Sequence, residues 1–176
     1  MTVAGVAGVE KVAPYLNEAQ FDIVFASTLQ RAYKTAKILT KGKKKIIKDS
    51  RLLELRMGTW KKDVEYADCF NQLGDVQSNY VKFADGAESF AEIKARCQSF
   101  LADLKQNHAG QTVLVAVHGI LLRAMMSVIF DQEMNDITNL KNVGFIEVYF
   151  DEKYEFKPFL RNYNSTLPQY YGRKRI

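Results

Sequence analysis

The stretch Thr112-Val113-Leu114-Val115-Ala116-Val117-His118-Gly119 decides the fold of this 176-residue chain. A continuous apolar run of this length predicts a strand buried on both faces. The run ends in an ionisable ring and a glycine, and residues 120–130 follow as an apolar segment typical of a helix. In α/β sheets, ligands lie beyond the carboxyl ends of strands and near helix N-termini. His118 is therefore a candidate site residue; the alternative is a histidine that caps the strand and bonds to backbone.

Helical and strand patterns alternate along the rest of the chain. Helices are expected from Thr2, from Leu29 and from Ser89; Ser27 with Gln30, and Ser89 with Glu92, match the capping box. Strands are expected over residues 21–26, 45–48, 144–150 and 155–159, the last two joined by a turn at 151–154, with short helices within 63–84. This alternation predicts an α/β fold, a three-layer α/β/α sandwich with a mainly parallel sheet, in a single domain over residues 1–176.

Composition limits the classes of function. An apolar fraction of 47% fits a globular protein, and no apolar run reaches the roughly 20 residues that span a bilayer. The formal charge of +5 is partly concentrated at Lys41–Lys45 and Arg173–Arg175, without the aromatic interleaving or reading element that nucleic-acid binding requires. Cys69 and Cys97 have no metal or redox spacing, which favours buried thiols and a cytoplasmic location.

Two further polar residues follow predicted strands. Arg31 lies in the first turn of a helix, where the helix dipole disfavours a cation unless an anion binds there too. Glu54 is a carboxylate among apolar neighbours, a setting that can raise its pKa and let it donate a proton. Taken singly, a solvent-facing Arg31 and a salt bridge from Glu54 to Arg51 or Arg56 are the favoured alternatives.

Together these segments resemble the histidine phosphatase superfamily, the phosphoglycerate-mutase-like proteins. Their order is Ser27-x-Leu-x-Arg31-Ala-x-x-Thr-Ala, Leu53-Glu54-x-x-x-Gly-x-Trp60, and then His118-Gly119 between a strand and a helix. Gly86-Ala87-Glu88-Ser89 resembles a Gly-Glu-Ser that opens a helix in the family, and Asn142 precedes a late strand as it often does there. The resemblance runs from Thr2 to about Asn164.

The resemblance implies a phosphomonoester hydrolase or mutase acting through a phosphohistidine, without metal or other cofactor. It implies that Arg31 is one of two arginines, and His118 the second of two histidines, that bind the phosphoryl oxygens. Glu54 would be the catalytic acid that protonates the leaving oxygen. The implied partner is a phosphorylated small molecule or inorganic phosphate, with no membrane.

The nucleophile of that family belongs to an Arg-His-Gly triplet that ends the first strand, and this sequence holds no such triplet. Its two histidines are His118 and His108, and His108 lies in a hydrophilic loop. Met1-Thr2-Val3-Ala4-Gly5 resembles the start of the first family helix. We therefore expect an N-terminally truncated domain, a sheet that lacks the family's first strand, and no phosphatase activity in the chain as written.

Three interpretations remain open: a histidine phosphatase whose start lies upstream, a non-catalytic remnant or anion-binding module around Arg31 and His118, and a basic nucleic-acid-binding protein. Buried unpaired backbone groups cost about 1–3 kcal/mol each, so a sheet without an interior strand is poorly stabilised. We expect poor folding, aggregation or self-association through the exposed sheet.

Overall fold

The computed structural model describes residues 1–16, 20–59, 84–134, 137, 143–150, 156–157, 160–162 and 169–171. In chain order the elements are α1 (Val3–Val12), the 3-10 helix η1 (Ala13–Tyr15), β1 (Ile23–Ser27), α2 (Gln30–Leu39), β2 (Ile46–Asp49), the 3-10 helix η3 (Ser50–Leu52), α4 (Phe90–Asn107), β3 (Val113–Ala116), α5 (Gly119–Phe130) and the short strands β4 (Tyr149–Phe150), β5 (Phe156–Lys157), β6 (Leu160–Asn162) and β7 (Gln169–Tyr171).

A parallel sheet organises the molecule. Its strand order is β2-β1-β3, and β1 pairs in parallel with both neighbours, Ile23 opposite Val113 and Val24 opposite Ile46. Two antiparallel pairs, β4 with β5 and β6 with β7, form separate two-stranded sheets. The predicted α/β class with a mainly parallel sheet is confirmed. Among the described residues, no helix is both long and apolar enough to cross a membrane.

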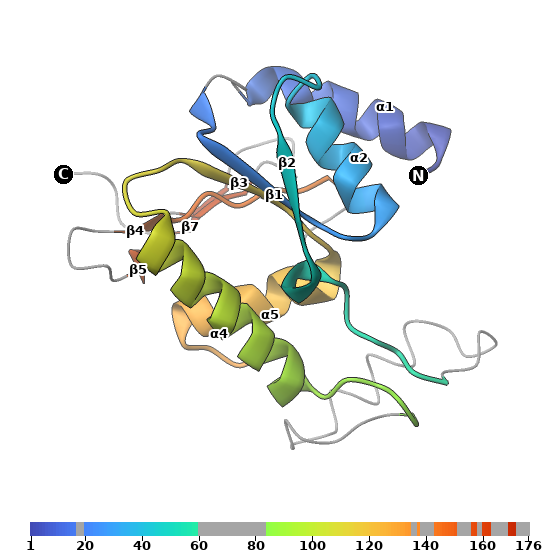
Figure 1. Ribbon diagram of the computed structural model, residues 1–176, viewed down its shortest axis with the longest axis vertical. Helices are drawn as coiled ribbons and strands as arrows, with labels where there is room; N and C mark the ends of the chain where they lie inside the picture. The colour runs from blue at the N-terminus through green and yellow to red at the C-terminus, as the bar shows by residue number, and fades with distance from the viewer. Residues whose placement is uncertain are drawn as a thin grey trace.

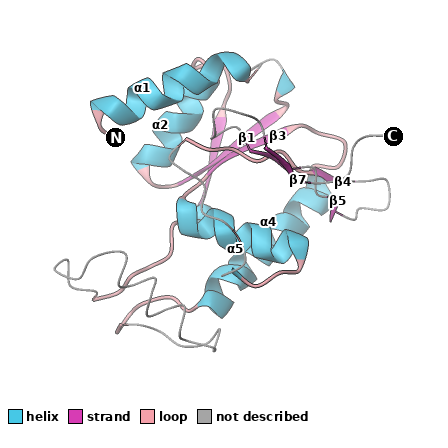
Figure 2. Ribbon diagram, turned by 180° about the vertical axis from the view of Figure 1, so that it is seen from behind, coloured by secondary structure: helices cyan, strands magenta, loops and turns pink. Residues whose placement is uncertain are grey.

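Helices cover both faces of this sheet. Figures 1 and 2 show α1 and α2 on one side of the strands and α4 and α5 on the other. Side chains of β1 alternate accordingly, because successive residues of a strand point to opposite faces. Phe25 packs into the cluster built by α4 and α5, whereas Val24 and Ala26 pack with Ala36 of α2. The three-layer arrangement therefore has a core on each side of the sheet.

Two of the three predicted helix starts are confirmed by their caps. The Thr2 side chain accepts a hydrogen bond from the backbone N–H of Gly5, and Ser89 and Glu92 form the reciprocal capping box of α4. The capping box expected at Ser27 is wrong. Ser27 is the last residue of β1, its hydroxyl accepts from the N–H of Leu29 at 3.3 Å, and Leu29 itself is the N-cap of α2.

Two strands are shorter than expected. β3 ends at Ala116, and its first three residues are only partly buried, because β1 is its one strand neighbour in the described sheet. Residues 144–148 have no regular secondary structure, and the strand begins at Tyr149. The predictions for the turn at 151–154, for the helices within 63–83 and for Asn142 lie outside the described residues.

Candidate functional site

Two side chains that follow neighbouring strands meet at one edge of the sheet. β1 and β3 are parallel, so their carboxyl ends lie at the same edge, and the chain continues from them into α2 and α5. Arg31 lies in the first turn of α2 and His118 is the N-cap of α5. The Arg31 Nε donates a hydrogen bond of 3.1 Å to Nδ1 of His118, across 87 positions of sequence.

This bond fixes the state of the imidazole. A guanidinium only donates, so Nδ1 of His118 accepts and the ring proton resides on Nε2. His118 is 8% exposed, and its Nε2 is buried with no hydrogen-bond partner among the residues described. Burial first, and then the positive charges of Arg31 and Arg96, lower the pKa of His118 to about 4. At neutral pH the ring is therefore uncharged and holds one N–H donor that is not satisfied within the described structure.

His118 does not act as a cap through its side chain. Its backbone is the N-cap of α5, but the ring makes no capping hydrogen bond to that helix. The alternative in which the ring bonds to backbone is therefore wrong, because Nδ1 of the ring accepts from the side chain of Arg31. Arg31 is an exposed residue, which agrees with the alternative of a solvent-facing arginine. Its Nε nevertheless donates to Nδ1 of His118.

The carboxylate of Glu54 lies against the start of α5. Its Oε1 accepts from the N–H groups of Leu55 and Leu121, both at 3.0 Å, and its Oε2 accepts from the N–H of Ile120 at 3.4 Å. The first N–H groups of a helix have no partner within the helix, and Glu54 supplies that partner here. The alternative salt bridge of Glu54 to Arg51 or Arg56 is formed with neither residue in the described structure; Arg51 pairs instead with carboxylates of β2 and α4.

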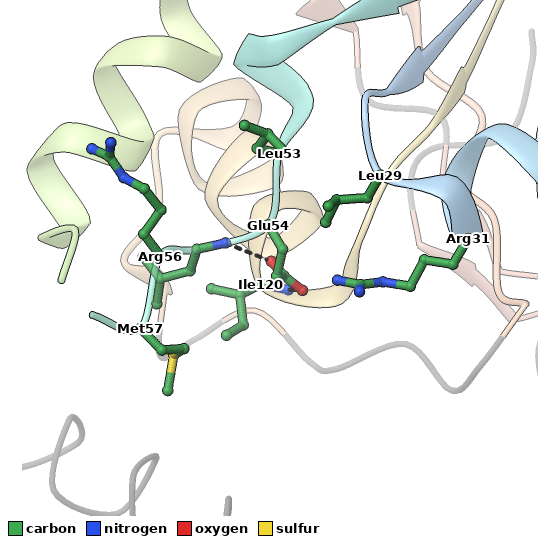
Figure 3. Close-up of a pocket in the computed structure, with 8 residues that line it drawn as sticks. Leu29, Arg31, Leu53, Glu54, Arg56, Met57 and Ile120 are labelled. Atoms are coloured by element: carbon green, nitrogen blue, oxygen red, sulfur yellow. Dashed lines mark hydrogen bonds between the residues drawn. The ribbon is translucent and has the colours of Figure 1, made fainter. Parts of the chain in front are cut away.

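A cavity of about 440 Å³ is lined by Arg31 and Glu54, and His118 is not among its lining residues. This volume lies in the range of small-molecule sites. Figure 3 shows the Arg31 guanidinium and the Glu54 carboxylate extending into it from different elements. The remaining lining is mostly apolar: Leu29, Leu53, Leu55, Arg56, Met57 and Ile120. The structure thus brings Arg31 together with His118 directly, and Arg31 together with Glu54 across the cavity.

One part of the site was not predicted. Glu88, noted in the sequence only as part of a motif, forms a two-point ion pair with Arg96, from Nε to Oε1 at 2.6 Å and from Nη2 to Oε2 at 2.8 Å. Arg96 also donates from Nη1 to the carbonyl of Arg51 at 2.6 Å. The two residues lie eight positions apart, one on each side of the N-cap of α4, and this separation is outside the i,i+3 and i,i+4 spacings that predict a side-chain pair on a helix.

Comparisons with known proteins identify related sequences. The family model described as "Histidine phosphatase superfamily (branch 1)" matches residues 1–163. Phosphoserine phosphatase 1 of Hydrogenobacter thermophilus is 26% identical over 151 residues, which cover 81% of this chain and 71% of that protein. Phosphoglycerate mutase-like protein 4 of Arabidopsis thaliana is 27% identical over 131 residues, covering 69% of this chain and 56% of that protein.

Solved structures show the same fold. YhfR of Bacillus stearothermophilus superposes with a TM-score of 0.76 at 21% identity, covering 91% of this chain and 83% of that one. A mutant phosphoserine phosphatase of Entamoeba histolytica in complex with phosphoserine also reaches 0.76, at 22% identity, covering 94% of this chain and 84% of that one. With its parallel sheet and the family match over almost its whole length, this chain belongs to branch 1 of the histidine phosphatase superfamily.

Proposed function

We propose that the cavity binds the phosphoryl group of a phosphorylated small molecule, as in a phosphomonoester hydrolase of the histidine phosphatase type. Arg31 and the Nε2–H of His118 bind phosphoryl oxygens, and Glu54 faces the leaving oxygen as its proton donor. The observation that carries the proposal is the Arg31–His118 hydrogen bond, which leaves a buried Nε2–H with no partner in the described structure.

The remaining donors suit an anion. The bond to His118 uses Nε of Arg31, so the two terminal nitrogens of the guanidinium fork are available to a planar pair of oxygens. In this proposal Arg31 supplies the cation, and the neighbouring His118 supplies the neutral N–H donor, for the phosphoryl group.

Phosphoserine is the first substrate to test. One relative is named phosphoserine phosphatase, and one structure of the same fold was solved with phosphoserine bound. The cavity volume admits a molecule of this size.

Turnover needs a nucleophile that these residues do not supply. In the phosphohistidine mechanism an imidazole nitrogen attacks phosphorus, the P–O bond to the leaving group breaks, the leaving oxygen takes a proton, and water then cleaves the P–N bond. In His118, Nδ1 accepts from Arg31 and Nε2 holds the proton. His108 contacts Phe25 edge-on and precedes the amino end of β3, whereas the site lies beyond the carboxyl end. We therefore propose that the chain as written forms no phosphohistidine.

The second candidate function is anion binding without catalysis. It is favoured because His118 has no free nitrogen to attack phosphorus and His108 lies away from the site. Isothermal titration with inorganic phosphate and with vanadate tests binding, and hydrolysis of an aryl phosphate tests turnover. We expect one anion bound per chain, no turnover, and no label retained after incubation with radiolabelled phosphoserine. An acid-labile labelled protein would contradict the absence of a phosphohistidine, and no binding of either anion would contradict the site itself.

Two expectations concern the chain as a whole. Cytoplasmic location, inferred from the cysteines, stays a prediction; Cys97 is a buried free thiol, and Cys69 lies outside the described residues. Self-association through the sheet also stays a prediction, and light scattering over a range of protein concentrations measures it.

A further inference from the structure

An ion pair with a buried carboxylate joins Glu88 to Arg96, and neither side chain is assigned a bond to the substrate in the proposed function. The Glu88 side chain is 3% exposed and that of Arg96 18% exposed. Both carboxylate oxygens of Glu88 accept from the guanidinium, at 2.6 and 2.8 Å. A bidentate pair of this kind is directional as well as strong, because the planar fork permits one relative orientation. It can therefore fix the position of whatever else it bonds.

What it bonds is the segment that contains Glu54. Arg96 donates to the carbonyl oxygens of Arg51, at 2.6 Å, and of Glu54, at 3.4 Å. Glu88 accepts from the N–H of Arg56 at 3.3 Å, and its own N–H donates to the Arg56 carbonyl at 2.9 Å. The backbone on either side of Glu54 is thus bonded to the two members of one ion pair.

The pair itself rests on a rigid element. Arg96 lies within α4, and Glu88 immediately precedes Ser89, the N-cap of that helix. Just beyond the segment, Met57 bridges to Ala87 in an antiparallel pairing. Glu54 is therefore held by two helices. Its backbone is bonded to the ion pair on α4, and its carboxylate is bonded to the first turn of α5.

We infer that the Glu88–Arg96 pair is a positioning element that holds the Glu54 carboxylate against the first turn of α5 and at the wall of the cavity. Its importance for phosphoryl binding rests on the proposed function; its effect on Glu54 does not. Without the pair, the segment loses bonds at Arg51, Glu54 and Arg56 together. The carboxylate then leaves the amides of Ile120 and Leu121.

Hydrogen exchange at the amides of Ile120 and Leu121 tests this inference. Leu121 N–H bonds to Glu54 across 67 positions, and Ile120 N–H bonds to the same carboxylate. First-turn amides have no partner inside the helix, so their hydrogen exchange reports on Glu54 directly. Exchange is measured by NMR in the wild type, in Arg96→Met and in Glu88→Gln. Glu54→Ala gives the rate expected when the carboxylate is absent.

A matched control removes a different ion pair from the same helix. Asp103→Asn in α4 removes the charge of one partner in the 2.7 Å contact with Arg51, and Asp103 bonds to neither Glu54 nor Glu88. If Arg96→Met does not fold because the Glu88 charge is left buried, the double change Glu88→Gln with Arg96→Met removes both charges at once.

The measured quantity is the exchange rate at Leu121 and Ile120 relative to that of the β1 amides. We expect Arg96→Met to raise this ratio about tenfold or more, toward its value in Glu54→Ala. Asp103→Asn leaves this ratio unchanged. Affinity for inorganic phosphate falls in Arg96→Met, and Arg96→Lys restores part of it. Two results would overturn the inference. One is an unchanged Leu121 exchange rate in a folded Arg96→Met or double variant, and the other is a rise in exchange rate shared equally by all amides. A wild type that binds no phosphate but shows the Leu121 effect contradicts the proposed function and leaves the positioning role standing.

Discussion

Arg31 and His118 are joined by a 3.1 Å hydrogen bond from Nε to Nδ1, although 87 positions separate them. The bond determines the tautomer, since the guanidinium can only donate. It also sets a cation beside a ring that is 8% exposed. The pairing therefore shapes both the hydrogen-bonding capacity and the titration of the site.

The first prediction concerns the titration of His118. Burial is the largest cause of its lowered pKa of about 4, and the charge of Arg31 is the second. Arg31→Met should raise the pKa of His118 part of the way toward its ordinary value of 6.5, because burial remains. NMR titration of the ring resonances measures this, with His108 giving the second signal. An unchanged pKa would show that the two side chains do not interact in solution.

A second prediction links that pKa to stability. The unfolded chain binds a proton at His118 near pH 6.5, whereas the folded chain binds it near pH 4. The contribution is therefore fully present above pH 6.5 and is lost as pH falls from 6.5 to about 4. It amounts to about 3 kcal/mol in total, and about 2 kcal/mol of this is lost by about pH 5.

Urea unfolding at several pH values checks this in the wild type and in His118→Gln. The difference in unfolding free energy between them should shrink as the pH is lowered through this window. A constant difference would contradict the lowered pKa.

A third prediction compares two glycines that both require positive φ. Gly58 has φ +62° and Gly110 has φ +76°. A Cβ at Gly58 would collide with the backbone of Asp85 and Ala87, whereas none of the described atoms lies within 4 Å of one at Gly110. Gly110→Ala should cost about 1–2 kcal/mol, the price of a left-handed conformation. Gly58→Ala should cost about 2 kcal/mol more and should lower phosphate affinity.

Chemical denaturation of the two variants measures the difference. Equal stability losses would mean that the close approach of the two loops at Gly58 does not persist in solution.

A fourth prediction concerns the core between the sheet and α4. Phe100 is completely buried, and its ring meets that of Phe25 edge-on at 5.4 Å between centroids. Phe100→Ala should lower the unfolding free energy by about 3–5 kcal/mol, because a cavity is left that the neighbours fill only in part. Phe100→Leu, which keeps most of the volume, should lose much less. A loss below about 1 kcal/mol for the alanine variant would contradict this packing.

The parts of the molecule that follow local rules were predictable from the sequence. The capping box at Ser89 and the helical spacing after it define α4, and parallel strands place Arg31 and His118 at one edge. The helix from about Leu29 was predicted at its place, whereas its capping box at Ser27 is wrong because Ser27 is the last residue of β1 and Leu29 is the N-cap. The prediction that β3 is buried on both faces overestimated the burial of its side chains. An apolar pattern does not show how many neighbours a strand has.

The finer parts of the site depend on tertiary packing. The Glu54 carboxylate reaches amides of α5 that lie more than 60 positions away, and no local pattern encodes that contact. The Glu88–Arg96 pair joins residues eight positions apart, outside the i,i+3 and i,i+4 spacings from which a helical side-chain pair is predicted. Residue types indicated the chemistry, whereas the fold supplied the partners.

The most direct test of the central claim is NMR observation of the His118 Nε2–H signal during titration with inorganic phosphate. If Arg31 and His118 form the anion site, this signal shifts and saturates with one phosphate per chain, and Arg31→Met weakens the binding about tenfold or more. A signal that does not move at any phosphate concentration, or that moves equally in the wild type and in Arg31→Met, would contradict the account.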